Sequence, residues 1–507
     1  MNADTDEMKA VELNELDPEE QPMTEDHQET EEEKNGSTKL KAPGAKFTGL
    51  SKEELIKVAG TPCWVRTRCV LLILFWLGWV GMLAGAIVAL VQAPLCKSIP
   101  DMSWWNEGPL YQISDVEAFS GGLYGVAGRL DEINQLKVKG LVLGPLHVVQ
   151  QDEPLTLDLK YVRPFHGSED AVIILLERAH RKGISVILDL TPNYLGEHPW
   201  FSSTSVDGEL MEQAKAAAEF WLDLGFDGIM LPEPSLLSWS DDWWKLKAAI
   251  QGNRTDYIKK KVLMGVVNNV SAEEVFQLIN TTGFDLILSD LLSQNEGRER
   301  IKALEVLSSQ RDSVAWGLGA SQKRHLSEST DHTRLYQLLL LTMPGTPVFT
   351  YGDEIGLSAQ GSEPPEMIWD TEEEEVKGVA FNETAERRAE QEERAAVKKW
   401  FKSISELRVK ERSLLHGNYY SLYSSESSLA FLRQWEESAR YITAVNWGST
   451  PEKLTLTLKP QEGVELPKKA KVKLSTDESL KEESSVSLNS FTLAPGQSVL
   501  LQFPYTG

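Results

Sequence analysis

The chain has 507 residues and a mass of 56.7 kDa, which leaves room for one large folded body and a smaller domain. A hydrophobic share of 41% and a charged share of 25% are typical of globular proteins and exclude a collagen-like, fibrous or wholly disordered chain. The formal net charge of −25 opposes binding to nucleic acid or to anionic lipid, because those partners carry the same sign.

The first 46 residues are rich in Glu and Asp and contain no aromatic residue, which predicts a disordered acidic tail. A short helix should follow, because Ser51 and Glu54 form a capping box and Leu50 and Leu55 a hydrophobic staple. Its end is expected at Gly60. This helix either leads directly into the next segment or docks a partner, and the sequence leaves both readings open.

The segment Cys69–Val91 has no charged residue and is long enough, as a helix, to cross the roughly 30 Å hydrocarbon core of a membrane. A buried core helix of this length would have a polar face, and a signal peptide would begin near residue 1. We therefore predict one transmembrane helix and assign it residues 69–92.

Basic residues determine the expected orientation of this helix. Lys52, Lys57, Arg66 and Arg68 precede it, whereas only Lys97 closely follows it, so the N-terminus should be cytoplasmic. The expected topology is single-pass type II, with everything after the helix outside the cell.

Four glycosylation acceptor triplets agree with this topology. They begin at Asn253, Asn269, Asn280 and Asn382. The triplet at Asn35 would be cytosolic and unused.

Two features suggest a membrane partner. Gly81, Gly85 and Ala89 place small side chains on one stripe of the helix, which would let another helix approach closely. The alternative is that these are ordinary glycines, which are frequent in membrane helices. Cys96 lies just outside the membrane with no other cysteine in the expected extracellular part, so an intermolecular disulfide is the simplest outcome, with a free or lipidated thiol as the alternative. Cys63 and Cys69 are interpreted as small hydrophobic residues.

Short apolar runs alternate with amphipathic helical patterns from Leu110 to about Arg412, which predicts a (β/α)8 barrel of eight parallel strands. The predicted strands are Leu110–Ile113, Gly140–Leu143, Ser185–Asp189, Gly228–Leu231, Val262–Gly265, Asp285–Leu288, Val314–Trp316 and Val348–Tyr351.

After Leu415 the pattern changes to short strands divided by turns, which predicts a small antiparallel β-sandwich. Its expected strands are Tyr441–Asn446, Leu454–Leu458, Ala470–Leu474 and Val499–Phe503.

Blocks in this region resemble the α-amylase family of glycoside hydrolases over residues 104–507. In chain order they are Trp104-Trp105 with Leu110–Ile113, Gly140–Pro145, Phe165–Asp170, Val186–Asn193, Gly225–Gly228, Pro344–Gly356 and Met367–Asp370. The resemblance implies the same barrel followed by a β-domain.

The residues at the positions that correspond to the family's catalytic residues differ in this chain. Glycoside hydrolysis needs paired carboxylates, and the resemblance implies that the arginine and the nucleophilic aspartate fall on Met230 and Pro232. The acid falls on Val266, and the aspartate near strand seven falls on Ser321. We therefore expect that the domain is not an enzyme.

Two carboxylates remain to be considered. Asp189 is kept, but a single leftover carboxylate cannot catalyse the reaction. Glu233 is one residue out of register, and a one-residue shift turns a strand side chain to the other face. The sequence contains no zinc-protease motif, Walker loop or nucleophile elbow, so neither a metal site nor a cofactor is expected.

The acidic tail, the single apolar helix, Cys96 and the altered barrel together resemble the heavy subunits of heteromeric amino-acid transporters. One type of heavy subunit carries a domain inserted after the third barrel strand, for which the short connection from Trp200 to Glu209 leaves no space. The blocks Lys46–Leu55, Phe75–Trp79 and Lys410–Gly417 resemble the type without the insertion.

The predicted division is a cytoplasmic acidic tail with a short helix (1–68), a transmembrane helix (69–92), an extracellular linker with Cys96 (93–103), the barrel (104–414) and the β-sandwich (415–507).

The resemblance implies a non-catalytic subunit that escorts a multispanning light subunit to the plasma membrane, joined to it through Cys96. It also implies contact with integrin β subunits. The alternative is a membrane-anchored carbohydrate-binding or adhesion receptor with no transporter partner, and sugar binding without cleavage stays open.

Overall fold

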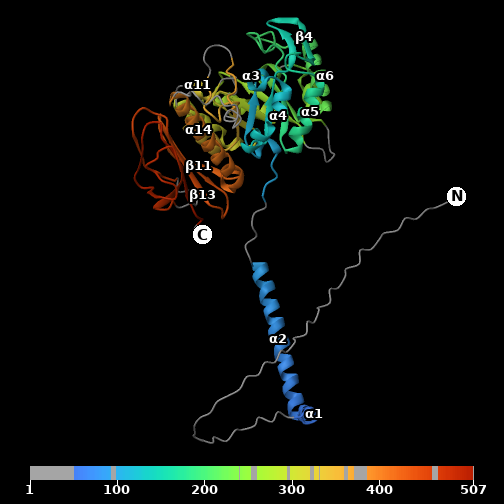
Figure 1. Ribbon diagram of the computed structural model, residues 1–507, viewed down its shortest axis with the longest axis vertical. Helices are drawn as coiled ribbons and strands as arrows, with labels where there is room; N and C mark the ends of the chain where they lie inside the picture. Colours follow the sequence, from blue (N-terminus) through green and yellow to red (C-terminus); the bar gives the residue numbers. More distant parts are fainter. Residues whose placement is uncertain are drawn as a thin grey trace, which may run out of the picture. The chain divides into compact units, whose positions relative to one another are not determined.

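The computed structural model describes residues 51–92, 99–238, 240–252, 260–293, 297–319, 325–329, 332–358, 364–369, 385–458 and 466–505 (Figure 1). The chain divides into two compact units, Met1–Cys96 and Lys97–Gly507.

The first unit begins with the predicted short helix, α1 (Lys52–Ala59). The Ser51 hydroxyl accepts a hydrogen bond from the Glu54 amide at 3.4 Å, and the Glu54 carboxylate accepts one from the Ser51 amide at 3.2 Å. This reciprocal pair satisfies two amides that a helix start would otherwise leave free. The capping box and the helix end at Gly60 are confirmed, while Leu50 lies outside the described residues.

The next helix, α2 (Pro62–Gln92), has 31 residues and is long and apolar enough to cross a membrane. It begins before the predicted start at Cys69, because a proline fits the first turn of a helix and no breaker follows it. At 1.5 Å per residue the helix is about 46 Å long, which exceeds the hydrocarbon core. The additional first turns carry Arg66 and Arg68.

The second unit contains a closed barrel of eight parallel strands, in the order β1-β10-β9-β8-β7-β6-β5-β2. All eight predicted strands are confirmed, with ends that differ by up to two residues. They are β1 (Leu110–Ile113), β2 (Gly140–Leu143), β5 (Ser185–Asp189), β6 (Gly228–Pro232), β7 (Val262–Val267), β8 (Leu286–Ser289), β9 (Val314–Trp316) and β10 (Thr346–Thr350).

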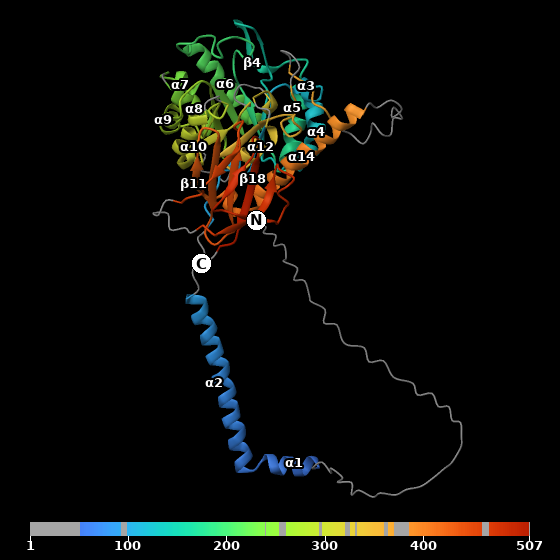
Figure 2. The same ribbon diagram turned by 90° about the vertical axis from the view of Figure 1, so that its left-hand side faces the viewer.

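Helices follow the strands and cover the outside of the barrel (Figures 1 and 2). They are α3 (Val116–Ser120), α4 (Leu123–Gln135), α5 (Glu169–Arg181), α6 (Gly208–Leu224), α7 (Pro234–Leu237), α8 (Trp243–Gln251), α9 (Ala272–Thr282), α10 (Gly297–Leu307), α11 (Leu326–Ser329), α12 (Thr333–Thr342), α14 (Ala385–Lys410) and α15 (Arg412–Leu415).

The interior of the barrel is an apolar cluster separate from the layer between strands and helices. Alternate residues of a strand point inward, and Leu110, Val142, Ile187, Met264 and Leu288 are among those that fill the interior. The barrel is therefore a packed core, and only its rim can hold a site.

A β-hairpin that the sequence analysis did not predict follows β2. It comprises β3 (His147–Gln150) and β4 (Glu153–Val162). The Trp221 indole of α6 donates a hydrogen bond to the Leu159 carbonyl at 2.8 Å and thereby fixes the hairpin to the barrel. The connection from β5 to α6 forms no strand, in agreement with the predicted lack of an inserted domain.

The C-terminal part is a six-stranded antiparallel sheet together with a two-stranded sheet of β14 (Glu452–Leu454) and β17 (Phe491–Leu493). The six strands are β11 (Asn418–Ser424), β12 (Ser428–Gln434), β13 (Arg440–Asn446), β18 (Ser498–Phe503), β15 (Lys469–Ser475) and β16 (Ser485–Ser487), in that order. The sequence analysis missed β11, β12, β16 and β17. It also misplaced the strand predicted at Leu454–Leu458, because β14 is Glu452–Leu454 and pairs with β17 (Phe491–Leu493).

Both faces of the large sheet are buried. Leu429 and Phe431 belong to the barrel's main core, whereas Ala430 and Leu432 pack with Leu454 of the small sheet. The second layer of the predicted sandwich is therefore only two strands, and helices of the barrel supply the other cover, with α12 against β13 and β18 (Figure 2).

Candidate functional site

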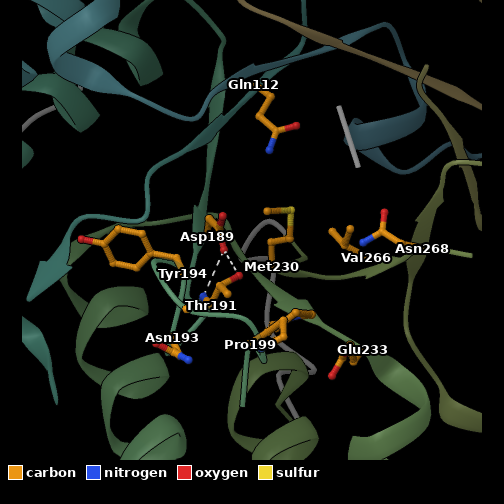
Figure 3. Close-up of a pocket in the computed structure, with 12 residues that line it drawn as sticks. Gln112, Asp189, Thr191, Asn193, Tyr194, Pro199, Met230, Glu233, Val266 and Asn268 are labelled. Carbon is orange, nitrogen blue, oxygen red and sulfur yellow. Dashed lines mark hydrogen bonds between the residues drawn. The ribbon is translucent and has the colours of Figure 1, made fainter. Parts of the chain in front are cut away.

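A cavity of about 170 Å³ lies at the carboxyl ends of the barrel strands, where barrel enzymes place their active sites (Figure 3). Its lining comes from β1, β5, β6, β7 and the connections that follow them. The lining residues are Gln112, Asp189, Thr191, Asn193, Tyr194, Gly196, Pro199, Met230, Pro232, Glu233, Val266 and Asn268.

The structure brings three of the predicted altered positions together. Met230, Pro232 and Val266 all line the cavity, and Pro232 pairs with Val266 in the parallel register of β6 and β7. Met230 is part of the barrel's apolar interior, and Val266 packs against it. At these three positions the wall is apolar and offers neither a nucleophile nor an acid. Ser321 lies outside the described residues.

Asp189, which the sequence analysis interpreted as retained from the family, ends β5 and is fully buried. Its Oδ1 atom accepts hydrogen bonds from the Thr191 amide at 3.0 Å and the Thr191 hydroxyl at 2.5 Å. These contacts hold the carboxylate in place at the floor of the cavity, beside Met230 in the register of β5 and β6.

The hairpin β3–β4 fixes the loop that forms one wall. The Asn193 amide donates to Asp152 at 2.9 Å, and its side-chain oxygen accepts from the Asp152 amide at 3.1 Å. The Tyr194 hydroxyl accepts from Arg163 at 3.2 Å and donates to the His147 carbonyl at 3.1 Å. Both side chains are thus engaged by the protein itself.

The position of Glu233 differs from the expectation that its side chain would point to the other face of the strand. It follows β6 with φ of 50°, as the N-cap of α7, so the alternation of the strand no longer applies to it. Its carboxylate lines the cavity, and its Oε2 atom is buried without a hydrogen-bond partner. Burial raises the pKa of the Glu233 carboxyl, against the opposing effect of His198.

Gln112 is a lining residue that the sequence analysis did not select. It is 1% exposed, and its Oε1 atom has no hydrogen-bond partner. In Figure 3 the amide nitrogen of Gln112 is turned towards Asp189 and Met230, and the amide oxygen points to the side. A signal was available, because Gln112 shares the inward face of β1 with Leu110 and is the last inward residue of that strand.

No group of three or more His, Cys, Asp or Glu is arranged to hold a metal ion within the described ranges. Asp189 and Glu233 are the acidic residues among those that line the cavity.

The other predicted sites are distributed along the chain. Asn269 and Asn280 are exposed, in the loop before α9 and in α9. Gly81, Gly85 and Ala89 are exposed on α2, and nothing lies within 4 Å of a Cβ built on either glycine. Cys96, Asn253 and Asn382 lie outside the described residues.

Solved structures share the fold of the second unit. The trehalulose synthase of Pseudomonas mesoacidophila has a TM-score of 0.58 at 14% identity, covering 80% of this chain and 100% of that chain. The trehalose-6-phosphate hydrolase of Bacillus licheniformis has a TM-score of 0.56 at 14% identity, covering 79% and 100%. At these identities the likeness shows the fold alone.

Two family models match the sequence. The one described as "Solute carrier family 3 member 2 N-terminus" matches residues 37–111, and "Alpha amylase, catalytic domain" matches residues 97–254.

Relatives match over the whole chain. The "Amino acid transporter heavy chain SLC3A2" of Oryctolagus cuniculus is 38% identical over 535 residues, and that of Mus musculus is 39% identical over 536 residues. Both alignments cover 100% of this chain and 100% of the relative. The "Amino acid transporter heavy chain SLC3A1" of Rattus norvegicus is 22% identical over 608 residues, covering 90% and 86%. From the full-length similarity at 38% and 39% identity it follows that this chain belongs to the SLC3A2, or 4F2, family of amino acid transporter heavy chains.

Proposed function

We propose that the chain is the non-catalytic heavy subunit of a heteromeric amino-acid transporter. It binds and stabilises a multispanning light subunit and escorts it to the plasma membrane, as a type II protein with a cytoplasmic N-terminus. The observation that carries the proposal is the full-length similarity to relatives named amino acid transporter heavy chains.

The composition of α2 supports the proposal that the light subunit, and not this chain, contains the transport path. A path for polar amino acids needs polar or charged groups within the membrane, and α2 has no charged residue from Cys69 to Gln92. The side chains of α2 from Cys69 to Val91 are almost all apolar, so lipid or a membrane partner must cover them. The transport path would then belong to the light subunit.

The residues that line the barrel cavity support the proposal that the chain is not a catalyst. A retaining glycosidase needs two carboxylates on either side of the scissile bond, and the positions on β6 and β7 are Pro232 and Val266. We expect no hydrolysis of maltooligosaccharides by the full-length protein above a buffer control. A turnover that Glu233→Gln abolishes would contradict this.

Cys96 offers the direct test of the subunit role. Membranes from cells expressing the wild-type chain or Cys96→Ser are run on a non-reducing gel, and shifted bands are identified by mass spectrometry. We expect a reductant-sensitive band that contains a multispanning transporter and is absent in Cys96→Ser. Cys69→Ser is the matched control and should keep the band. A monomer in all samples would favour the adhesion or carbohydrate-binding alternative.

The escort role is tested separately from the disulfide bond, by measuring how much light subunit reaches the cell surface. Removal of this chain from the cells should lower the amount of light subunit at the cell surface, and re-expression should restore it. An unchanged surface amount would leave a disulfide-linked partner but contradict the escort role.

The proposal includes contact with integrin β subunits through the tail and α2, which rests on the family resemblance. Coprecipitation of an integrin β subunit should persist when residues 104–507 are replaced by an unrelated ectodomain. Loss of coprecipitation in that chimaera would contradict an interaction through these parts.

A further inference from the structure

A second hollow, of about 420 Å³, lies at the other end of the barrel from the cavity at the strands' carboxyl ends. Its lining residues Glu107 and Lys139 lie before the amino ends of β1 and β2. The start of the second unit, from Ile99 to Met102, and the ends of α14 and α15 complete the lining. We call this hollow the linker groove.

The wall of the linker groove is largely apolar and only partly covered by the protein. Ile99 is 49% exposed. The other apolar lining residues are half-buried, and they are Pro100, Met102, Val409 and Leu415. A cavity of about 150 Å³ in another protein accepts benzene, so the linker groove has room for about two ring-sized apolar side chains.

The charges in the wall largely offset each other. The Lys139 ammonium lies 3.3 Å from the Glu107 carboxylate, and Asp101 is exposed at the edge. Burial and the neighbouring arginines lower the pKa of the His416 ring, which is therefore neutral at pH 7. The linker groove thus favours an apolar occupant over a strongly charged one.

Hydrogen bonds hold the wall in its shape before any partner binds. The Arg311 guanidinium donates to the His416 carbonyl at 2.6 Å. The Lys139 amide donates to the Pro109 carbonyl at 2.9 Å. A site that is already ordered loses less conformational entropy when it is occupied, so an apolar contact here contributes more to binding.

The linker groove begins three residues after Cys96, because Ile99 is its first lining residue. Three extended residues span about 10 Å, and the Cα atoms of a disulfide are about 6 Å apart. A cysteine joined to Cys96 would therefore stay within about 16 Å of Ile99. Such a short tether gives the attached segment an effective concentration in about the millimolar range, at which a weak apolar contact is occupied.

We propose that the linker groove binds the extracellular segment of the light subunit that flanks the cysteine joined to Cys96. Apolar side chains of that segment lie against Ile99, Met102, Val409 and Leu415. This inference rests on the proposed function, which supplies the disulfide-linked partner. The disulfide and the linker groove then fix one extracellular segment of the light subunit at two neighbouring points.

The test places a photoreactive side chain in the linker groove of the full-length protein, in cells that contain the light subunit. Met102 or Val409 is replaced by p-benzoylphenylalanine, the cells are irradiated, and the membranes are reduced before the gel. The control position is Leu155, which is 98% exposed in the hairpin after the carboxyl end of β2. Thermal melting confirms that each variant folds.

We expect Met102 and Val409, but not Leu155, to give a crosslinked band that survives the reductant and contains the transporter. Peptide mapping should assign the crosslink to residues that flank the transporter's disulfide cysteine. Ile99→Asp should lower the yield from Met102 about tenfold, the change expected when one apolar side chain is withdrawn from an interface. Ile368→Asp, at an isoleucine that is 39% exposed elsewhere, should leave it unchanged.

The outcomes separate this inference from the subunit role. A Cys96-dependent band without a crosslink from Met102 or Val409 would overturn the inference and leave the subunit role intact. A crosslink to a second copy of this chain, or a yield unaffected by Ile99→Asp, would also overturn it. Loss of the Cys96-dependent band itself would contradict both.

Discussion

Glu354 is a buried carboxyl whose environment favours the protonated form. It is 2% exposed, its Oε1 accepts the Tyr111 hydroxyl at 2.9 Å, and its Oε2 is buried without a partner. Burial raises the pKa of the Glu354 carboxyl, and this outweighs the opposing effects of hydrogen bonds and of the Lys398 charge. The folded protein therefore holds this proton more tightly than the unfolded chain does.

The raised pKa of Glu354 determines how the stability of the folded protein changes with pH. The stabilising contribution of Glu354 is complete below its unfolded pKa and is lost as pH rises through the raised folded pKa. Each unit of that shift removes about 1.4 kcal/mol at neutral pH. Glu354→Gln stays neutral and keeps the shape, so we expect its melting temperature, relative to wild type, to be higher at pH 7.5 than at pH 5. Thermal melting at both pH values measures this, and a relative melting temperature independent of pH would contradict it.

At the scale of elements, the start of α9 combines a helix cap with a glycosylation triplet. Ser271 is the N-cap of α9, its hydroxyl accepts from the Glu274 amide at 3.3 Å, and its amide donates to the Glu274 carboxylate at 2.7 Å. The same serine is the third residue of the triplet that begins at Asn269.

Two substitutions separate these roles. Asn269→Gln and Ser271→Ala both remove the glycan, but only Ser271→Ala also removes the cap. We expect both variants to lose the same glycan mass, and Ser271→Ala to be less stable than Asn269→Gln by about 1 kcal/mol. Glycosidase digestion and chemical denaturation measure the two effects. Ser271→Thr should keep both, and equal stability of the two loss variants would contradict a role for the cap.

The junction between the barrel and the large sheet contains two buried arginines. Arg433 of β12 donates to the Thr342 carbonyl at 2.7 Å and to the Gly417 carbonyl at 2.9 Å. Arg408 of α14 donates to the carbonyls of Leu341 and Met343 at 2.9 and 2.8 Å. The carbonyls of residues 341–343 lie at the end of α12, where a helix leaves them unsatisfied and where cations are favourable.

Replacement of Arg433 tests this junction. Arg433→Met keeps most of the length but leaves the carbonyls of Thr342 and Gly417 without a donor. We expect a loss of stability of about 2 to 4 kcal/mol, the order of two charge-assisted hydrogen bonds. Urea denaturation measures it, with the exposed Arg181→Met as control. A loss below about 0.5 kcal/mol would show that the junction does not depend on these bonds.

At the scale of the whole molecule, the triplets on both sides of α2 report its orientation. If the N-terminus is cytoplasmic, Asn269 and Asn280, both exposed, are accessible to the glycosylation machinery, whereas Asn35 is not. We expect Asn269→Gln and Asn280→Gln each to lower the mass, and Asn35→Gln to leave it unchanged. Glycan at Asn35 alone would show the opposite orientation.

Local pattern was sufficient for the elements of the barrel, because a parallel strand buried on both faces reads as a short apolar run wherever it occurs. Local pattern was also sufficient for α2, because an apolar helix of this length is recognised from its own residues without any tertiary contact. The sequence blocks that resemble known heavy subunits were sufficient to predict the family as well. The position of Met230, Pro232 and Val266 at one rim followed from barrel symmetry, which places the carboxyl ends of all strands together.

Tertiary structure alone decided the rest. The strand Ser428–Gln434 is a short apolar run that a buried helix segment could equally contain, and only pairing with β11 and β13 makes it a strand. Hairpin β3–β4 is fixed by contacts to α6 and to the loop at Asn193, which lie far away in sequence. Glu233 enters the cavity because its backbone leaves the strand with positive φ, and side-chain alternation ends where the strand ends. Periodicity determines which segments are strands and helices, but packing decides where the residues between them point.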